Sequence, residues 1–186
     1  ARDRQIKVSR RMDDFKPVAD GESGEIATRG AHVGPGYWRN DEATAENFRD
    51  GWCYTGDVGY IDENGYLFIL DRRKDMIISG AENIYPAEVE NAIHGHPHVA
   101  EVAVIGVPDE EWGERPLALV VCKEGEDLEP QAIATHLQGF VDRGHITKWA
   151  IPRQIRIVPD IPKTSVGKIN KRLIRELEAS NGKDII

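Results

Sequence analysis

Three lysines, a proline, a glycine and two hydroxyl residues fall within ten positions near the end of the chain, in "PKTSVGKINK" at 162–171. Gly167 and Lys168 are one half of the P-loop pattern. That pattern also needs a glycine five residues earlier and a Ser or Thr after the lysine. Position 162 is proline and position 169 is isoleucine, so the stretch is not a P-loop.

Two other interpretations of this stretch stay open. A solvated basic loop leading into a helix is the simpler one when the loop is taken alone. However, Pro162 and Gly167 bracket Thr164 and Ser165, an arrangement that predicts a hairpin-like loop with Lys168 at its tip. Lysine is a compact charge on a long stem, which suits it to reach an anionic oxygen from a mobile element.

A second candidate is the aspartate of "YTGD" at 54–57. The two oxygens of Asp57 can accept two hydrogen bonds from hydroxyl groups, and the 2′,3′-diol of a ribose offers such a pair. An ordinary turn aspartate is the alternative that the motif alone favours.

A third candidate is "DRRKDMIISGAENIYPAEVE" at 71–90, which runs from charged residues through an apolar strand to Ser79-Gly80 and a proline-started helix. Gly80 permits a ligand to approach the backbone closely. A plain turn is the alternative.

The composition bounds what such residues do. The chain has 186 residues, 40% hydrophobic and 30% charged, and a formal net charge of −8, which predicts one or two small globular domains and argues against a nucleic-acid binder. Cys53 and Cys122 have no metal or disulfide spacing. Apolar runs such as 117–122 are too short to span a membrane. We therefore expect a reducing, cytoplasmic location and no transmembrane segment.

Charge and periodicity predict the elements that position these motifs. The first 70 residues are β-rich, with a short helix over 41–48 and a hairpin at about 57–70, where Asn64-Gly65 separates two β-rich runs. Five consecutive charged residues, 71–75, predict an exposed connection and a domain boundary. Beyond it, strands are predicted at 99–107, 116–123 and 153–158, and helices at 86–94, from Pro130, and at 171–179.

The three motifs in this order resemble the adenylate-forming superfamily, and within it the acyl-CoA synthetases. The segment 51–90 is especially similar to fatty-acyl and aryl-acid CoA ligases, and "VAEVAVIGVPDEEWGERPLALVV" and "IPKTSVGKINKRLIREL" continue the match. The resemblance covers about residues 21–180. It implies an α+β fold: a mobile C-terminal domain (76–186) with a three-stranded sheet and helices, a hinge (71–75), and a β-rich end of a large N-terminal domain (1–70).

The resemblance also implies a two-step reaction. A carboxylic acid, fatty or aryl, joins ATP to give acyl-AMP, the small domain rotates, and the CoA thiol attacks the acyl-AMP. The phosphate loop, the acid pocket and most contacts to Mg²⁺ would lie upstream in the N-terminal domain. We therefore expect this chain, which begins at Ala1, to be part of a longer enzyme and inactive alone.

Residue roles follow from the matched motifs only. Lys168 corresponds to the lysine that bridges the carboxylate and the α-phosphate, where a fixed cation stabilises developing charge. By the same match, Asp57, Arg72 and Tyr54 are expected to bind the nucleotide. Lys74 is expected at the hinge, and Ser79, Gly80 and Ala81 on the CoA side.

Several alternatives remain. The domain could load a carrier-protein thiol instead of CoA, although "ELEASNGKDII" at the end of the chain contains no carrier site. It could also be a non-catalytic binding module that kept the fold. His94, His96 and His98 alternate in "HGHPHV", but a helix end followed by His-Pro is commoner than a metal site, and we expect no metal site there.

Overall fold

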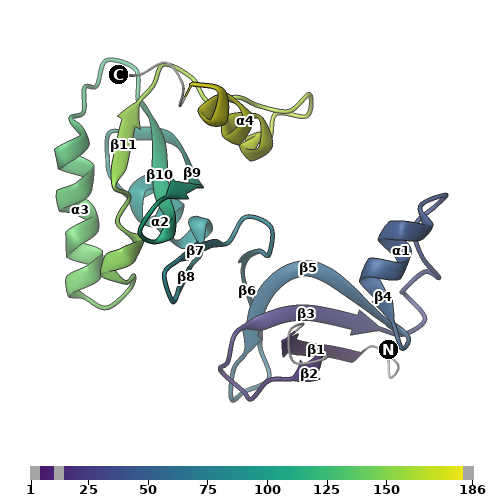
Figure 1. Cartoon of the computed structure of the whole chain (residues 1–186). Helices are drawn as coiled ribbons and strands as arrows, with labels where there is room; N and C mark the ends of the chain where they lie inside the picture. Colours follow the sequence, from purple (N-terminus) through teal and green to yellow (C-terminus); the bar gives the residue numbers. More distant parts are fainter. Residues whose placement is uncertain (1–4, 11–14, 182–186) are drawn as a thin grey trace. The chain divides into compact units, whose positions relative to one another are not determined.

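The computed structural model describes residues 5–10 and 15–181 (Figure 1). The chain divides into two compact units, Ala1–Lys74 and Asp75–Ile186. Each unit has its own sheet, so each is described by itself.

The first unit is built on an antiparallel sheet in the order β2-β1-β3-β5-β4, with β6 also paired to β5. Asn40 caps the one short helix, α1 (Asp41–Asn47), by accepting a hydrogen bond from the Ala43 N–H at 3.0 Å. The predicted short helix is therefore present. The strands are β1 (Gln5–Arg10), β2 (Lys16–Pro17), β3 (Gly24–Arg29), β4 (Phe48–Arg49), β5 (Trp52–Ile61) and β6 (Leu67–Arg72).

The predicted hairpin in this unit is confirmed. Strands β5 and β6 pair from Asp57 opposite Arg72 to Ile61 opposite Leu67. Residues 62–66 connect them, and the Asp62 carboxylate accepts hydrogen bonds from the backbone N–H groups of Asn64 and Tyr66 at 3.0 and 2.7 Å. Gly65 has φ +82°, a conformation that costs glycine little.

The second unit contains a mixed sheet in the order β11-β10-β7-β8, with β9 paired to β10. The three predicted strands are present as β9 (Val99–Asp109), β10 (Gly113–Cys122) and β11 (Gln154–Ile157). The sheet is larger than the three strands expected, because β7 (Ile77–Ser79) and β8 (Glu82–Ile84) form a short hairpin that joins its edge. The apolar strand expected before Ser79-Gly80 is therefore present as β7, whereas β8, with three residues, is too short to show alternation in the sequence.

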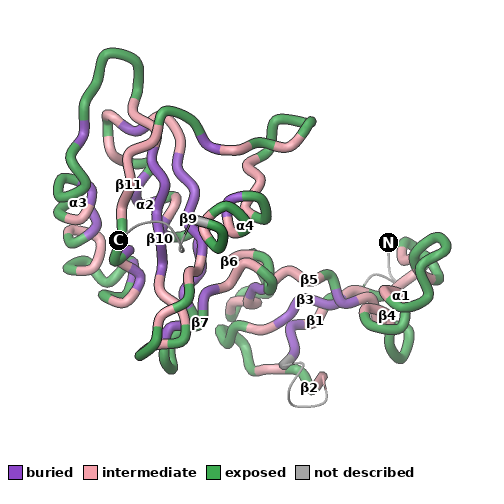
Figure 2. The backbone as a smooth tube through the Cα atoms, turned by 45° about the horizontal axis from the view of Figure 1, so that its top comes forward, coloured by how far each residue is buried: buried purple, intermediate pink, exposed green. Residues whose placement is uncertain are grey.

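Helices cover both faces of this sheet. Proline opens α2 (Pro86–His94) and α3 (Pro130–Asp142), as predicted, and α4 (Lys171–Asn181) ends the described chain. Successive residues of β9 and β10 alternate between two apolar clusters, one beneath α2 and α3 and one beneath α4. Buried residues therefore run without a break through the middle of both strands, over 102–105 of β9 and 116–120 of β10 (Figure 2), as expected for strands covered on both sides.

Candidate functional site

The loop that carries Lys168 is a small hairpin. Lys163 and Ile169 form an antiparallel bridge, and the Thr164 N–H donates to the Lys168 carbonyl at 2.7 Å. Gly167 turns the chain with φ +79°. The hairpin-like shape expected from the sequence is therefore present, and Lys168 is exposed near its tip.

The lysines of this stretch have different partners. Lys163 donates hydrogen bonds to Glu101 at 2.9 Å and to Asp160 at 3.3 Å. Both bonds raise the pKa of Lys163, and the bond to Glu101 has the larger effect. Lys171 forms a 2.8 Å ion pair with Glu90 of α2. Lys168 has no acidic partner within the part of the chain that the structure describes. Its ammonium group is therefore the one in this loop that is available to an added anion.

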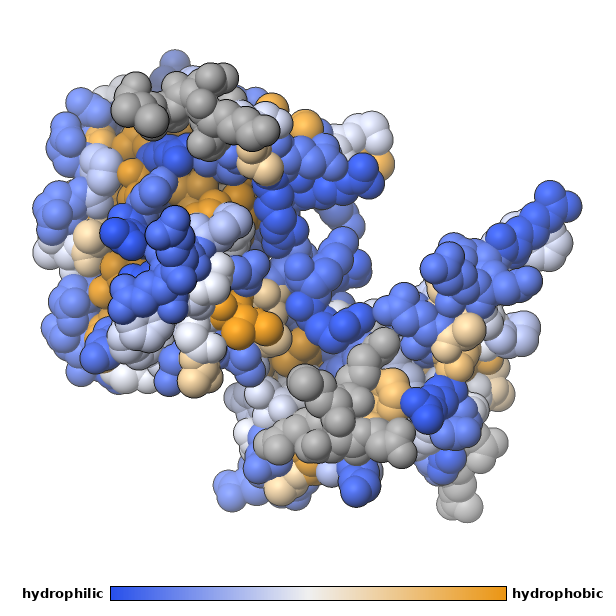
Figure 3. Space-filling view, in the orientation of Figure 1, coloured by the Kyte–Doolittle hydropathy of each residue, from blue (hydrophilic) through white to orange (hydrophobic). Residues whose placement is uncertain are grey.

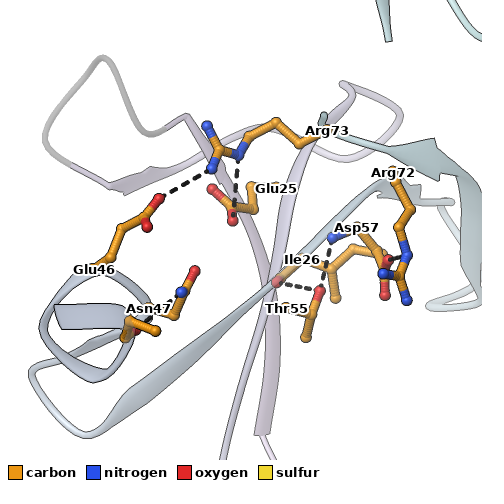
Figure 4. Close-up of polar contacts among 9 residues, drawn as sticks. Glu25, Ile26, Glu46, Asn47, Thr55, Asp57, Arg72 and Arg73 are labelled. Carbon is orange, nitrogen blue, oxygen red and sulfur yellow. Dashed lines mark hydrogen bonds and ion pairs between the residues drawn. The ribbon is translucent and has the colours of Figure 1, made fainter. Parts of the chain in front are cut away.

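Asp57 and Arg72 face each other across the β5–β6 hairpin. Arg72 Nε lies 3.3 Å from Asp57 Oδ1, and the side chains are 64% and 30% exposed, respectively. The Thr55 hydroxyl accepts a hydrogen bond from the Asp57 N–H at 3.1 Å and donates to the Ile26 carbonyl at 3.0 Å (Figure 4). This local network holds the carboxylate at the surface of the first unit.

Tyr54 is predicted to bind the nucleotide together with Asp57 and Arg72, but its side chain does not reach the surface on which those two residues lie. Its side chain is 2% exposed. Its ring lies 4.4 Å from that of Phe15, and the Lys7 ammonium lies 5.3 Å from its centroid. A ring packed in this way has almost no surface to offer a nucleotide, so the contact predicted for Tyr54 gains no support.

The connecting segment 73–75 is fixed on both sides of Lys74. The Arg73 N–H donates to the Gly56 carbonyl at 2.8 Å, and its guanidinium lies 3.8 Å from the buried Glu25 and 3.5 Å from Glu46 (Figure 4). Asp75 pairs with Arg175 of α4 at 2.8 Å. Lys74 lies between these two anchors and is exposed. The charged run predicted a connection but gave no sign of these partners.

The predicted CoA-side residues form the turn between β7 and β8. Ser79 pairs with Glu82, and Gly80 has φ +63°. The Gly80 N–H donates to the Trp112 carbonyl at 2.8 Å, and a Cβ at Gly80 would lie 2.9 Å from Cε3 of the Trp112 ring. Ser79 is buried, whereas Gly80 and Ala81 are exposed. The turn is therefore fixed against the loop that contains Trp112.

That loop, between β9 and β10, is itself well braced. One oxygen of Asp109 accepts hydrogen bonds from the N–H groups of Glu111 and Trp112, both at 3.0 Å, and the other pairs with Arg153 at 3.1 Å. The hydrogen bond from Trp112 is the main reason that the pKa of Asp109 lies below its ordinary value. The Trp112 ring packs 4.9 Å from that of Trp149. Asp109 thus stabilises the loop whose Trp112 contacts the Gly80 turn.

Comparison with known proteins shows which family the second unit resembles. Residues 88–168 match the family model described as AMP-binding enzyme C-terminal domain. The chain carries a domain of this family. It is 44% identical over 166 residues to a 2-succinylbenzoate–CoA ligase of Geobacillus kaustophilus, covering 89% of the chain and 33% of that protein. It is 46% identical over 160 residues to a feruloyl-CoA synthase of an Amycolatopsis species, covering 86% of the chain and 32% of the relative.

A solved structure gives the same result. The o-succinylbenzoate CoA synthetase of Bacillus subtilis, in complex with an acyl-adenylate intermediate, superimposes with a TM-score of 0.83 at 34% identity, over 93% of this chain and 34% of that one. The resemblance to the adenylate-forming superfamily, and the fold class that it implied, are confirmed. The chain spans about a third of the length of these relatives.

Two other features of the second unit, a cluster of histidines and a groove, lie apart from these residues. The ring of His96 contacts His98 and His136 edge-on at centroid distances of 5.5 and 5.2 Å, and burial, then these neighbours, lowers the pKa of His96. Among the residues that the structure describes, no group of three or more His, Cys, Asp or Glu is arranged to hold a metal ion.

A groove of about 720 Å³ lies beside α4, floored by Ile105 and Val107 and edged by Arg156 and Glu178. Apolar surface framed by hydrophilic residues is visible in this unit (Figure 3). Arg156 and Glu178 are bound to each other at 2.8 Å, so their charges are already neutralised. None of the helices formed by described residues has the length and apolar character that crossing a membrane requires.

Proposed function

We propose that this chain is the C-terminal part of an AMP-forming acid–CoA ligase. In the first step a carboxylate oxygen attacks the α-phosphorus of ATP, giving acyl-AMP and pyrophosphate. In the second step the CoA thiol attacks the acyl carbon, and AMP leaves. The names of the relatives, a 2-succinylbenzoate–CoA ligase and a feruloyl-CoA synthase, favour an aryl acid over the fatty acid that the sequence also allowed.

The observation that carries this proposal is the exposed ammonium group of Lys168, which pairs with no acid among the described residues, beside two lysines that are paired. Adenylation brings an anionic carboxylate against a polyanionic nucleotide, and charge is redistributed at the α-phosphate. A cation aimed at that position stabilises the transition state. Pairing Lys163 and Lys171 with acids shapes the loop, so that Lys168 can reach an anion without losing a partner.

The other residues take roles around the nucleotide and the thiol. The Asp57 oxygens accept hydrogen bonds from the ribose hydroxyls, and Arg72, held beside Asp57, approaches the phosphate side. Lys74 is the hinge about which residues 76–186 turn between the two steps, and the Ser79–Gly80–Ala81 turn faces CoA. Mg²⁺ accompanies ATP, bound mainly by its phosphates and by residues upstream of this chain. The cytoplasm, where ATP and CoA are available, is the proposed location.

The test uses the full-length gene product with Lys168→Met. Acid-dependent exchange of pyrophosphate into ATP should fall by about 10²-fold or more, the usual effect of removing one electrostatic stabiliser. Thioester formation from supplied acyl-AMP should stay within about threefold of wild type, since that step does not use the lysine. Equal loss in both steps would remove the assigned role.

Lys163→Met is the matched control, because Lys163 lies in the same loop but is bound to Glu101 and Asp160. It should slow pyrophosphate exchange much less than Lys168→Met. If both variants lose the same activity, the integrity of the loop matters rather than the charge of Lys168.

Two other functions are distinguishable in the same assays. An adenylation domain that loads a carrier protein would exchange pyrophosphate but transfer the acyl group to a carrier thiol and not to CoA. A non-catalytic module would show no exchange with any acid of an aryl and fatty panel.

A further inference from the structure

The two ends of the connecting segment 73–75 are held by different kinds of anchor. Arg73 is bound within the first unit, through its backbone to Gly56 and through its side chain to Glu25 and Glu46. Asp75, the first residue of the second unit, is bound by Arg175 of α4. The free stretch of backbone between these anchors is therefore reduced to Lys74.

The Asp75–Arg175 pair joins the start of the second unit to a helix near its end, one hundred residues further along the chain. The Asp75 side chain is 13% exposed and that of Arg175 is 32% exposed, and Arg175 Nη2 lies 2.8 Å from Asp75 Oδ1. A partly buried ion pair of this geometry is stronger than one on an open surface, because solvent screens it less.

Helix α4 also supports the Lys168 loop. The Asn170 side chain accepts a hydrogen bond from the Leu173 N–H at 3.1 Å, and its N–H donates to the Pro162 carbonyl at 2.8 Å. Lys171 fixes the first turn of the helix to Glu90. A rigid path thus runs from Asp75 through Arg175 and α4 to the loop that presents Lys168.

We propose that Asp75 and Arg175 are positioning residues that make the Lys168 loop follow the connecting segment when the second unit turns about Lys74. This inference rests on the proposed function. Without the pair, α4 and its loop lose their direct tie to the pivot, and Lys168 is placed less accurately against the nucleotide. Small misplacements of a catalytic group are costly, since about 1 Å can lower a rate by about 10²-fold.

The pair should affect the two half-reactions unequally. The Gly80 turn follows Asp75 directly through β7 (Ile77–Ser79), which is paired in the sheet with β8 and β10. Its placement therefore does not depend on Arg175. Loss of the ion pair should slow the step that uses Lys168 and spare the step that uses the Gly80 turn.

The experiment replaces Arg175 by Gln in the full-length gene product. Pyrophosphate exchange should fall by about tenfold in kcat with little change in KM for ATP, while thioester formation from supplied acyl-AMP should stay within about twofold. Arg172→Gln is the matched control, because Arg172 lies on the same helix and, among the described residues, forms its ion pair with Glu176 at the surface. It should leave both steps unchanged.

The reversed pair, Asp75→Arg with Arg175→Asp, provides the rescue. It should recover most of the exchange activity lost in Arg175→Gln, which a purely structural role of Arg175 elsewhere in α4 would not allow. Equal loss in both half-reactions, no loss, or no rescue by the reversed pair would overturn the proposal.

A second measurement does not depend on the proposed function. In the 186-residue chain, the backbone ¹⁵N–{¹H} NOE should be high at Arg73 and Asp75 and low at Lys74. Arg175→Gln should lower the value at Asp75 and leave Arg73 unchanged. If the NOE pattern follows this expectation but no acid supports pyrophosphate exchange in the wild type, the proposed function fails and the tether stands. An unchanged NOE at Asp75 in Arg175→Gln would refute the tether itself.

Discussion

Replacing Gly80 by alanine tests whether the Trp112 ring fixes the turn between β7 and β8. Two costs are expected. The left-handed conformation, φ +63°, costs alanine about 1–2 kcal/mol relative to glycine. The added Cβ would also lie 2.9 Å from Cε3 and 3.3 Å from Cζ3 of Trp112. Trp149 packs against that ring, so overpacking should cost about 1–3 kcal/mol more. The free energy of unfolding of the second unit should therefore fall by about 2–5 kcal/mol.

Gly125→Ala separates the two costs. Gly125 lies in the same unit with φ +79°, and nothing lies within 4 Å of the position that its Cβ would take. It should lose only the conformational part, about 1–2 kcal/mol. Urea denaturation of the 186-residue chain, followed by far-ultraviolet circular dichroism, measures both variants. The reasoning is refuted if Gly80→Ala is no more destabilising than Gly125→Ala, or if Trp112→Ala fails to relieve the difference.

Three further predictions follow from the same structure. Lys74→Pro, which fixes φ near −65° at the pivot, should slow the second half-reaction of the full-length gene product more than the first, and unchanged kinetics would count against a hinge there. Because the pKa of His96 is lowered from its ordinary 6.5, the unfolded chain binds the proton more readily, so stability should fall as the pH drops below 6.5. The urea midpoint at pH 5.5 and 7.5 should show a smaller difference in His96→Gln than in wild type. Ile174→Ala should cost about 2–5 kcal/mol in the same denaturation assay, since Ile174 is 2% exposed, while Leu177→Ala, at a 45% exposed position, should cost well under half as much.

The sequence was most informative where periodicity and punctuation agree. Proline at a helix start, followed by apolar residues at helical spacing, predicted α2 and α3 correctly, and the apolar runs at 99–107 and 116–123 predicted β9 and β10. It was weakest for β8, which is too short to show alternation, for the pairing of β7 with β10, and for Tyr54, whose burial depends on contacts with Phe15 and Lys7 from other strands and turns. A motif specifies residue types in order but not which of them turn inward.

Ion pairs between distant positions were also beyond the sequence. A run of five charged residues predicts exposure, yet Arg73 and Asp75 in that run are bound, whereas no residue in the described part of the chain pairs with Lys74. The chain has 32 Asp or Glu and 24 Lys or Arg, so opposite charge alone does not identify which acid pairs with which base. The partner is chosen by the fold, which brings Glu25 of β3 and Glu46 of α1 within reach of Arg73 in the first unit, and Arg175 of α4 within reach of Asp75 in the second.

The same argument explains why Lys168 could not be singled out from its loop by charge alone. Lys163, Lys168 and Lys171 are chemically equivalent in the sequence, and the difference between them arises from acids on other elements: Glu101 on β9, Glu90 on α2, and Asp160 before the loop. Those acids bind two of the three lysines, and no carboxylate of a described residue pairs with Lys168. Removing Glu101 and Asp160 together would take away both acids that bind Lys163. The hairpin would then lose the contacts that fix its Lys163 end. The surrounding sheet and helices thus determine which lysine of the loop is left to bind an anion. A variant that removes these acids should abolish the difference between the lysines although Lys168 itself is unchanged.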